Sequence, residues 1–337
     1  MQSQNLDFKQ GMVQQYNLNI ERQLPGDFVL TVGYAGSRST HILVGGVNLN
    51  IPSPSACDPT SPNFDPAYTF GCGRALPYGN FGTIANIADR GSARYDSLQI
   101  KGETKTRGGL YALLSYTYSR ALDNGFSDGV GTSTGATYYP LPGTAKADWA
   151  LSQIQLNHNF SASVIYELPF GKGKRFGNDL NPIVNGFLGN WEVDVIQRIT
   201  SGFPLFLVSS NNGSGVNFAS GTNRPNQLCN GRLDNHSIQE FFDTTCFEDP
   251  ALGQLGNANR TPLYGPGFVN TDFSAIKHFP LGFRDGANIE FRAEFFNVFN
   301  HAQFFTPGQD VDSSDFGQIS RTVNNPRLIQ FALKFSF

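Results

Sequence analysis

The last eleven residues of the chain, 327–337, alternate between two kinds of side chain. Every second position is apolar: Ile329, Phe331, Leu333, Phe335 and Phe337. The positions between them are mostly small or polar, and one of them is charged. A period of two places the two sets on opposite faces of a β-strand. A strand between lipid and a watery lumen needs this pattern, so the segment predicts a membrane-spanning strand.

The same alternation occurs in eight earlier segments, which gives about nine predicted strands. They cover residues 15–23, 28–36, 95–106, 110–120, 155–170, 191–199, 268–281, 287–300 and 327–337. No run approaches the roughly 18 apolar residues of a spanning helix, so a helical membrane protein is excluded.

The connections between the predicted strands alternate in length. Short turns lie at 25–27, 107–109 and 282–286, and a medium connection at 171–190 carries Lys172, Lys174 and Arg175. The other connections are long and polar: 37–91, 122–149, 209–266 and 301–325. In an up-and-down barrel, successive connections lie at opposite rims. Counting back from the C-terminus places the loops outside the cell and the turns in the periplasm.

These patterns predict an all-β fold, an antiparallel up-and-down transmembrane β-barrel. A soluble sandwich also alternates, but its loops show no such asymmetry, and no blade-length repeat indicates a propeller. Aromatic residues make up 13% of the chain, which suits aromatic girdles. The net charge of -3 gives no reason to expect a nucleic-acid partner.

The four cysteines fall into two pairs, each inside one long loop: Cys57 with Cys72, and Cys229 with Cys246. The predicted chemistry is two loop disulfides outside a reducing cytosol, each worth about 3 kcal/mol. Zinc is the alternative, but no C-x-x-C occurs and no histidine sits at ligand spacing.

We expect the chain to be the C-terminal part of a longer protein, a partial barrel of about nine strands. Residues 1–5 do not resemble a signal peptide, yet a barrel protein must be exported. Bacterial barrels normally have an even number of strands, and an open edge in lipid leaves backbone groups unpaired at several kcal/mol each. Further strands upstream would resolve both conflicts.

Four segments carry a family resemblance: 14–42, 254–281, 288–303 and 316–337. The most specific parts are R-x-E-x-F-N-x-F-N at 292–300 and P-R-x-I-Q-F-x-L-K-F-x-F at 326–337. Together they resemble the C-terminal barrel of Oar-like TonB-dependent outer-membrane transporters. Those proteins carry a carboxypeptidase-regulatory-like domain, then a plug, then a barrel of about 22 strands. Residues 1–337 contain no recognisable plug, TonB-contacting segment or N-terminal domain.

The resemblance implies that the chain forms the wall and outer loops of such a transporter in the bacterial outer membrane. The implied partners are outer-membrane lipid, a plug domain with the remaining upstream strands, and the TonB complex through N-terminal parts. Siderophores, saccharides, peptides and exported proteins remain open as solutes, and no cofactor is implied. Two alternatives are a small self-contained barrel acting as an adhesin or surface-structural protein, and an outer-membrane hydrolase. No H-E-x-x-H or G-x-S-x-G supports an enzyme.

Charged residues alternate on one face of two predicted strands. The lumen-facing candidates are Glu192, Asp194, Arg198, Glu290, Arg292 and Glu294. One interpretation is a charged inner wall that contacts plug or solute. The other is a cross-strand ion-pair ladder that keeps the wall wet and in register.

Three further sets have a functional and a structural interpretation. The loop aromatics Tyr138, Tyr139, Phe218 and Tyr264 either grip a ligand or form girdles and loop packing. Asp310, Asp312 and Asp315 either hold Ca²⁺ or form a solvated acidic loop, since the EF-hand glycine and glutamate are missing. By parity His158 faces lipid, where an outer-membrane lipase would need a Ser–His pair, but no serine lies two positions away on that face, so His158 is interpreted as an interfacial histidine.

Overall fold

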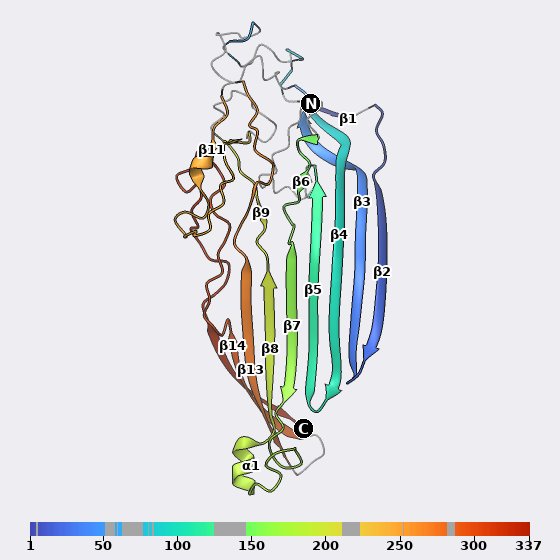
Figure 1. Cartoon of the computed structure of the whole chain (residues 1–337), viewed down its shortest axis with the longest axis vertical. Helices are drawn as coiled ribbons and strands as arrows, with labels where there is room; N and C mark the ends of the chain where they lie inside the picture. The colour runs from blue at the N-terminus through green and yellow to red at the C-terminus, as the bar shows by residue number, and fades with distance from the viewer. Residues whose placement is uncertain are drawn as a thin grey trace.

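Nine long strands form one curved antiparallel sheet in the computed structural model of the chain (Figure 1). The structure describes residues 1–4, 6–50, 58, 60–62, 77–79, 81–82, 84–124, 146–210, 223–251, 253–281 and 287–337. The nine strands are β2 (Met12–Leu24), β3 (Phe28–Asn48), β4 (Ala85–Arg107), β5 (Leu110–Asp123), β7 (His158–Glu167), β8 (Trp191–Thr200), β13 (Phe268–Pro280), β14 (Asn288–Phe296) and β15 (Leu328–Ser336). All nine predicted strands are confirmed, and β3 and β4 extend well beyond their predicted ranges.

The sheet is not closed into a barrel. Its order is β15-β14-β13-β8-β7-β5-β4-β3-β2, so β2 and β15 are the edges of this path. Two short strands are attached to it: β1 (Gln2–Gln4) pairs with β4 in parallel, and β6 (Ala150–Leu151) pairs with β5.

The two ends of the sheet differ, as predicted. Figure 1 shows the short turns and the C-terminus at one end, here called the turn end, and the long connections at the other, the loop end. The β4–β5 turn has two residues, and Gly108 and Gly109 both have positive φ (61° and 84°), as a tight hairpin requires. The medium connection contains a helix that was not predicted, α1 (Pro182–Leu188). Within the described residues, no helix is long and apolar enough to cross a bilayer.

Apolar positions pair with apolar positions from strand to strand, which gives the sheet one apolar face. One row runs across β15, β14, β13, β8 and β7 as Ile329, Phe295, Phe273, Val195 and Val164. This face is exposed: Leu333 on β15 is 72% exposed, whereas the Glu290 side chain on the opposite face is 18% exposed. A soluble protein shows the reverse, because its apolar stripes are buried against each other.

Aromatic side chains border the apolar face at both ends. Near the loop end, Tyr118 pairs with His158, while Trp191 begins β8 at the turn end and its backbone oxygen accepts from Leu168 N. Ten residues along the chain separate His158 from Leu168. At about 3.3 Å per residue and a tilt near 40°, this separation gives a band about 25 Å tall, the height of the apolar band of outer-membrane barrels.

The main buried apolar cluster lies at the loop end and not under the sheet. It consists of Leu205, Leu207, Phe242, Cys246, Phe247 and Leu263, with Phe241, Val311 and Phe316 packed against it. We call the described residues of 201–267 and 297–327 the outer loop body. Short ladders hold it together: β9 (Pro204–Leu205) pairs with β12 (Leu263–Tyr264), and β10 (Asn226–Gln227) with β11 (Phe247–Glu248). The sequence predicted only long polar loops here.

A disulfide joins Cys229 to Cys246 across 17 residues of the outer loop body, which confirms one of the two predicted pairs. Cys57 and Cys72 lie outside the described residues. Cys246 belongs to the buried cluster, next to Phe247.

Removing this disulfide in a C229S/C246S variant should destabilise the outer loop body by about 3 kcal/mol, because the open chain gains loop entropy. Hydrogen exchange should show faster exchange of the amides that join β10 to β11, with the β13 and β14 amides unchanged. Equal protection of the β10–β11 amides in the variant and the parent would contradict the prediction.

Candidate functional site

The face opposite the apolar face, here called the polar wall, carries both groups of predicted charged residues. Across β8, β13 and β14, Glu192 pairs with Ile276, which pairs with Arg292. In the next row, Asp194 pairs with Ser274, which pairs with Glu294. The register therefore places both groups on one face, with β13 between them. Arg198 lies on the same face, with its guanidinium carbon 5.7 Å from the centre of the Phe268 ring.

Ion pairs on the polar wall run mainly along one strand. Arg292 Nε lies 2.9 Å from Glu290 Oε1, and Arg292 Nη1 lies 3.6 Å from Glu294 Oε1. A cross-strand contact of 3.8 Å joins His278 Nδ1 to Glu290 Oε2. The guanidinium thus bridges two carboxylates on its own strand, which differs from a ladder between strands.

Negative charge predominates in this part of the polar wall. Glu192, Asp194, Glu290 and Glu294 form what we call the acidic patch, and Arg292 lies within it. The Oδ1 atom of Asp194 is buried and has no hydrogen-bond partner among the described residues. A buried carboxylate oxygen without a partner is costly, so this arrangement suits a cationic group brought from elsewhere.

A second part of the polar wall holds a recess with mostly uncharged polar side chains. This cavity of about 270 Å³ is lined mainly by hydroxyl and amide side chains on β2–β5, with one lysine. The polar lining residues are Asn19, Thr31, Gln99, Lys101, Ser115 and Thr117. Lys101 forms an ion pair with Glu103 at 2.9 Å, and Ser115 Oγ lies 2.7 Å from Ser161 Oγ. Such a surface can hydrogen-bond to hydroxyl groups or to a peptide backbone.

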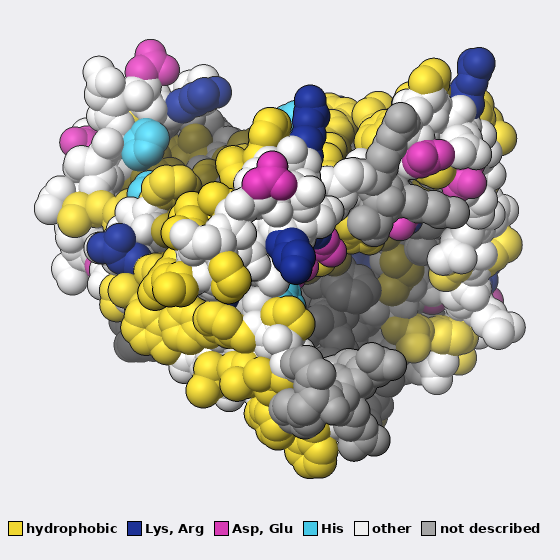
Figure 2. All heavy atoms as spheres, turned by 90° about the horizontal axis from the view of Figure 1, so that it is seen from below, with side chains coloured by type: hydrophobic (Ala, Val, Ile, Leu, Met, Phe, Trp, Pro, Cys, Tyr) yellow, Lys and Arg dark blue, Asp and Glu magenta, His cyan; other side chains and the backbone are white. Residues whose placement is uncertain are grey.

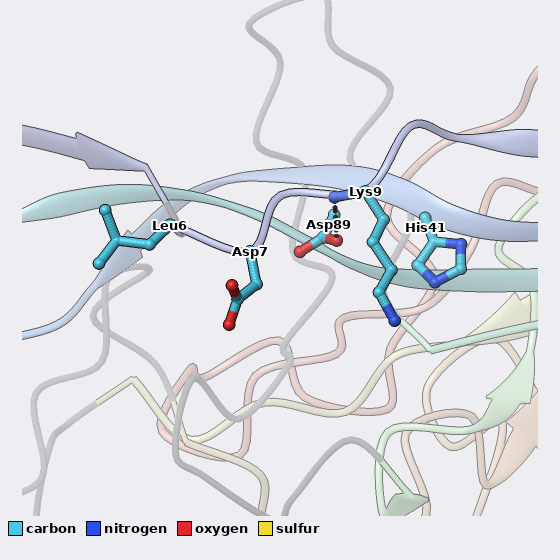
Figure 3. Close-up of a pocket in the computed structure, with 5 residues that line it drawn as sticks. All are labelled: Leu6, Asp7, Lys9, His41 and Asp89. Carbon is cyan, nitrogen blue, oxygen red and sulfur yellow. Dashed lines mark hydrogen bonds between the residues drawn. The ribbon is translucent and has the colours of Figure 1, made fainter.

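A second cavity, of about 490 Å³, lies towards the loop end of β3 and β4 (Figure 3). Leu6, Asp7 and Lys9 come from the segment before β2, while His41 belongs to β3 and Asp89 to β4. The backbone N–H of Lys9 donates to Asp89 Oδ2 at 2.7 Å and holds the segment against β4. Two carboxylates, one lysine and one histidine line this cavity, and this mixed lining indicates no particular ligand.

Two buried arginines fasten the outer loop body to the sheet. Arg260 Nη2 donates to the Asp123 carboxylate and to the Asp123 backbone oxygen, the latter at 2.8 Å, at the end of β5. Arg224 Nη2 donates to the Asp148 carboxylate, and its Nη1 donates to the Ala147 oxygen at 3.1 Å. All four charged side chains are buried. These contacts fix the outer loop body over the loop end of the polar wall.

Comparison with known proteins decides the family. A family model described as an outer membrane beta barrel domain matches residues 1–330. The chain belongs to this family. No curated protein matches this outer-membrane barrel.

Solved structures similar to this barrel include the outer membrane transporter YddB from Escherichia coli (TM-score 0.49, 10% identity, covering 98% of this chain and 33% of that one). Another is the FrpB iron transporter from Neisseria meningitidis (TM-score 0.42, 13% identity, 99% and 32% covered). A third is BauA, the ferric preacinetobactin receptor from Acinetobacter baumannii (TM-score 0.43, 9% identity, 97% and 29% covered). The chain spans about a third of the length of these proteins.

In an outer-membrane barrel, the exposed apolar face meets lipid, and His158 lies on this face. His158 Nδ1 is 2.8 Å from the Tyr116 hydroxyl, and its ring centre is 5.2 Å from that of Tyr118. Tyrosine and histidine rings at the border of the apolar band are typical of an aromatic girdle. The predicted interfacial role of His158 fits these contacts.

The other predicted loop residues have structural contacts or lie outside the described residues. Tyr138, Tyr139 and Phe218 lie outside them. Tyr264 OH accepts a hydrogen bond from Asn157 Nδ2 at 2.9 Å, which joins two connections.

Two of the three predicted calcium ligands, Asp310 and Asp315, hold loop backbone or a neighbouring hydroxyl through their carboxylates. Asp310 Oδ1 accepts from the backbone nitrogens of Ser210 and Asp312, at 3.3 and 3.1 Å, and Asp315 Oδ1 accepts from Ser313 Oγ at 2.5 Å. Among the described residues, the one cluster with metal-ligand geometry contains Cys229, Asp243 and Cys246, and its cysteines are already joined by the disulfide.

Sequence reasoning missed Arg224 and Arg260. Each is flanked by uncharged residues in the same long polar connection, and its partner lies more than 70 residues away in the sequence. No local pattern marks such a residue as buried.

Proposed function

We propose that this outer-membrane barrel forms the wall and outer loops of a TonB-dependent transporter and contributes to solute uptake across the outer membrane. The polar wall faces the lumen, with Glu192, Asp194, Arg198, Glu290, Arg292 and Glu294 directed towards a plug. Further strands and the plug come from an upstream part of the same protein, and TonB acts through that part. The outer loop body forms part of the mouth.

One observation carries this proposal: the sheet combines an exposed apolar face with a half-buried, charged polar wall. The sheet of a soluble protein buries its apolar face instead of exposing it. In a barrel filled only by its own side chains, the acidic patch would have too few cationic partners. A plug with basic side chains would supply the partner that Asp194 Oδ1 lacks. The two sequence motifs at 292–300 and 326–337 support the same transporter class.

The transporter proposal predicts that residues 1–337 cannot form a stable barrel alone. After refolding in detergent, the isolated chain should aggregate and give no heat-modifiable band on a gel. The same gene expressed with its upstream coding region should give a heat-modifiable band in the outer-membrane fraction. A monomeric heat-modifiable band from residues 1–337 alone would instead support a small self-contained adhesin or surface-structural barrel.

Uptake itself is tested in cells that carry or lack the gene. Labelled ferric siderophores, oligosaccharides and peptides are offered separately, with and without a protonophore. We expect one class to accumulate only in cells with the gene, and this accumulation to disappear when the protonophore removes the energy that drives TonB. Uptake that is unaffected by the protonophore would contradict TonB dependence.

A further inference from the structure

The connection between β7 and β8 is a fixed structural unit. We call residues 168–190 the turn-end segment. Asn181 caps α1 by accepting from Val184 N at 2.9 Å, and Asn185 Oδ1 accepts from Lys172 N at 2.7 Å. The two ends of the segment also touch, because a Cβ at Gly171 would lie 2.6 Å from the Cα of Gly189. The segment therefore presents its surface in one conformation.

The C-terminal end of α1 lies on the apolar side of the sheet. Trp191 Nε1 donates to the Phe187 backbone oxygen at 2.8 Å, and Lys277 Nζ donates to the Gly189 oxygen. Trp191 and Lys277 are paired neighbours on the apolar face, and the Lys277 ammonium lies 5.5 Å from the centre of the Trp191 ring. The lysine thus carries its charge out of the hydrocarbon band towards the helix end, as lysines near membrane borders do. These contacts place α1 at the lower border of the lipid-facing surface.

The segment exposes bulky apolar side chains next to cations. Ile183 and Phe187, four residues apart on one side of α1, are each 75% exposed. Lys172 and Arg175 are also exposed, while Lys174 is paired with Glu167 at 2.7 Å. Asp179 is the single acidic residue of the segment. Figure 2, seen from this end of the molecule, shows hydrophobic side chains in broad areas with Lys and Arg side chains among them.

We propose that the turn-end segment lies in the inner leaflet of the outer membrane and binds anionic phospholipid. Ile183 and Phe187 insert among the upper acyl carbons, and Lys172 and Arg175 contact lipid phosphates. Two observations select lipid as the occupant: the surface continues the lipid-facing apolar face past Trp191, and its net positive charge complements anionic headgroups. This inference rests on membrane location and on the predicted periplasmic position of the turns, and it is independent of transport.

The test adds one fluorescent indole at the proposed contact. The protein, expressed with its upstream coding region and freed of upstream tryptophans, carries F187W in a W149F background that keeps Trp191 and its bond to α1. It is placed in lipid nanodiscs, and the emission of the W149F parent is subtracted. We expect blue-shifted emission that brominated phospholipids quench and iodide does not. The matched control is I154W, because Ile154 is 74% exposed but lies at the loop end, where iodide should quench and brominated lipid should not.

Charge is tested with a second pair of variants. In zwitterionic nanodiscs doped with brominated phosphatidylglycerol, K172Q/R175Q should raise the amount needed for half-maximal quenching of the F187W indole by up to about 30-fold. This corresponds to about 1 kcal/mol for each charge. The control K146Q/R232Q removes two exposed cations outside the turn-end segment and should change nothing.

Three results would overturn the proposal. The first is iodide quenching of the F187W indole to the same extent as the I154W indole. The second is protection of the F187W indole from both iodide and brominated lipid, which would show that another protein or a second copy covers α1. The third is an unchanged response to phosphatidylglycerol in K172Q/R175Q.

Discussion

An R260A variant should lose about 3–5 kcal/mol of stability in the outer loop body, because removing one member of a buried ion pair is strongly destabilising. The Arg260 and Asp123 side chains are at most 5% exposed, and the ion pair joins residues 137 positions apart. The measurement is hydrogen exchange of the amides that join β9 to β12, which should exchange far faster. The β13–β14 amides serve as an internal reference and should be unchanged.

Two control variants separate loss of the charge pair from loss of packing. Burial lowers the pKa of Arg260, and the attraction to Asp123 opposes that shift without cancelling it. Replacing a buried ion pair by apolar residues of similar size is often neutral, so an R260M/D123L double variant should be nearly neutral. R232A, which removes an exposed arginine of the same body, should also be neutral. Unchanged protection in R260A would show that Asp123 gains water when the arginine is lost.

A lysine at Ile329 should destabilise the barrel by about 1–3 kcal/mol and lower its amount in the outer membrane. Ile329 lies on the apolar face and is the second residue of β15, which places it between the middle of the apolar band and the border at the loop end. A charge there would meet hydrocarbon. The measurement is denaturant unfolding of the complete protein in lipid, together with quantification of the outer-membrane fraction.

The adjacent position provides the matched control. Gln330 points to the polar wall and pairs with Glu294, so Q330K places the same charge one residue away on the other face. We expect Q330K to have little effect. A tolerated I329K together with a damaging Q330K would show that the faces are assigned the wrong way round.

The strands were predictable because the side chains of each strand alternate between an apolar face and a polar face, and this alternation is visible in the strand's own sequence. Alternation in β15 identifies both faces without any knowledge of its neighbour, and the tight turn at Gly108 is equally local. The strand ends were less certain: β4 begins at Ala85, where alternation gives way to Ala, Gly and Ser. The helix α1 escaped prediction because it has seven residues and lies between glycine-rich stretches.

The outer loop body was not predictable from local pattern. Leu205, Phe242 and Leu263 form one core, but they come from short apolar stretches that follow no common period and are far apart in the sequence. The motif at 292–300 was recognised in the sequence, but the role of its two asparagines is visible only in the structure. Asn297 and Asn300 both have φ of 52°, a conformation that asparagine tolerates, and Asn300 Oδ1 accepts from Arg327 N just before β15.

The strands differ in length, so β4 extends beyond the apolar band on one side of the molecule. We call this extension, residues 85–97, the collar. Leu98 on β4 lies level with Tyr118 and His158 at the border of the apolar band, and β4 continues for another 13 residues to Ala85. At about 3.3 Å per residue, this extension adds roughly 40 Å of strand beyond the hydrocarbon. The collar therefore extends further from the cell than the lipid surface beside it. Antibodies raised against whole cells should be able to bind it without contacting lipid.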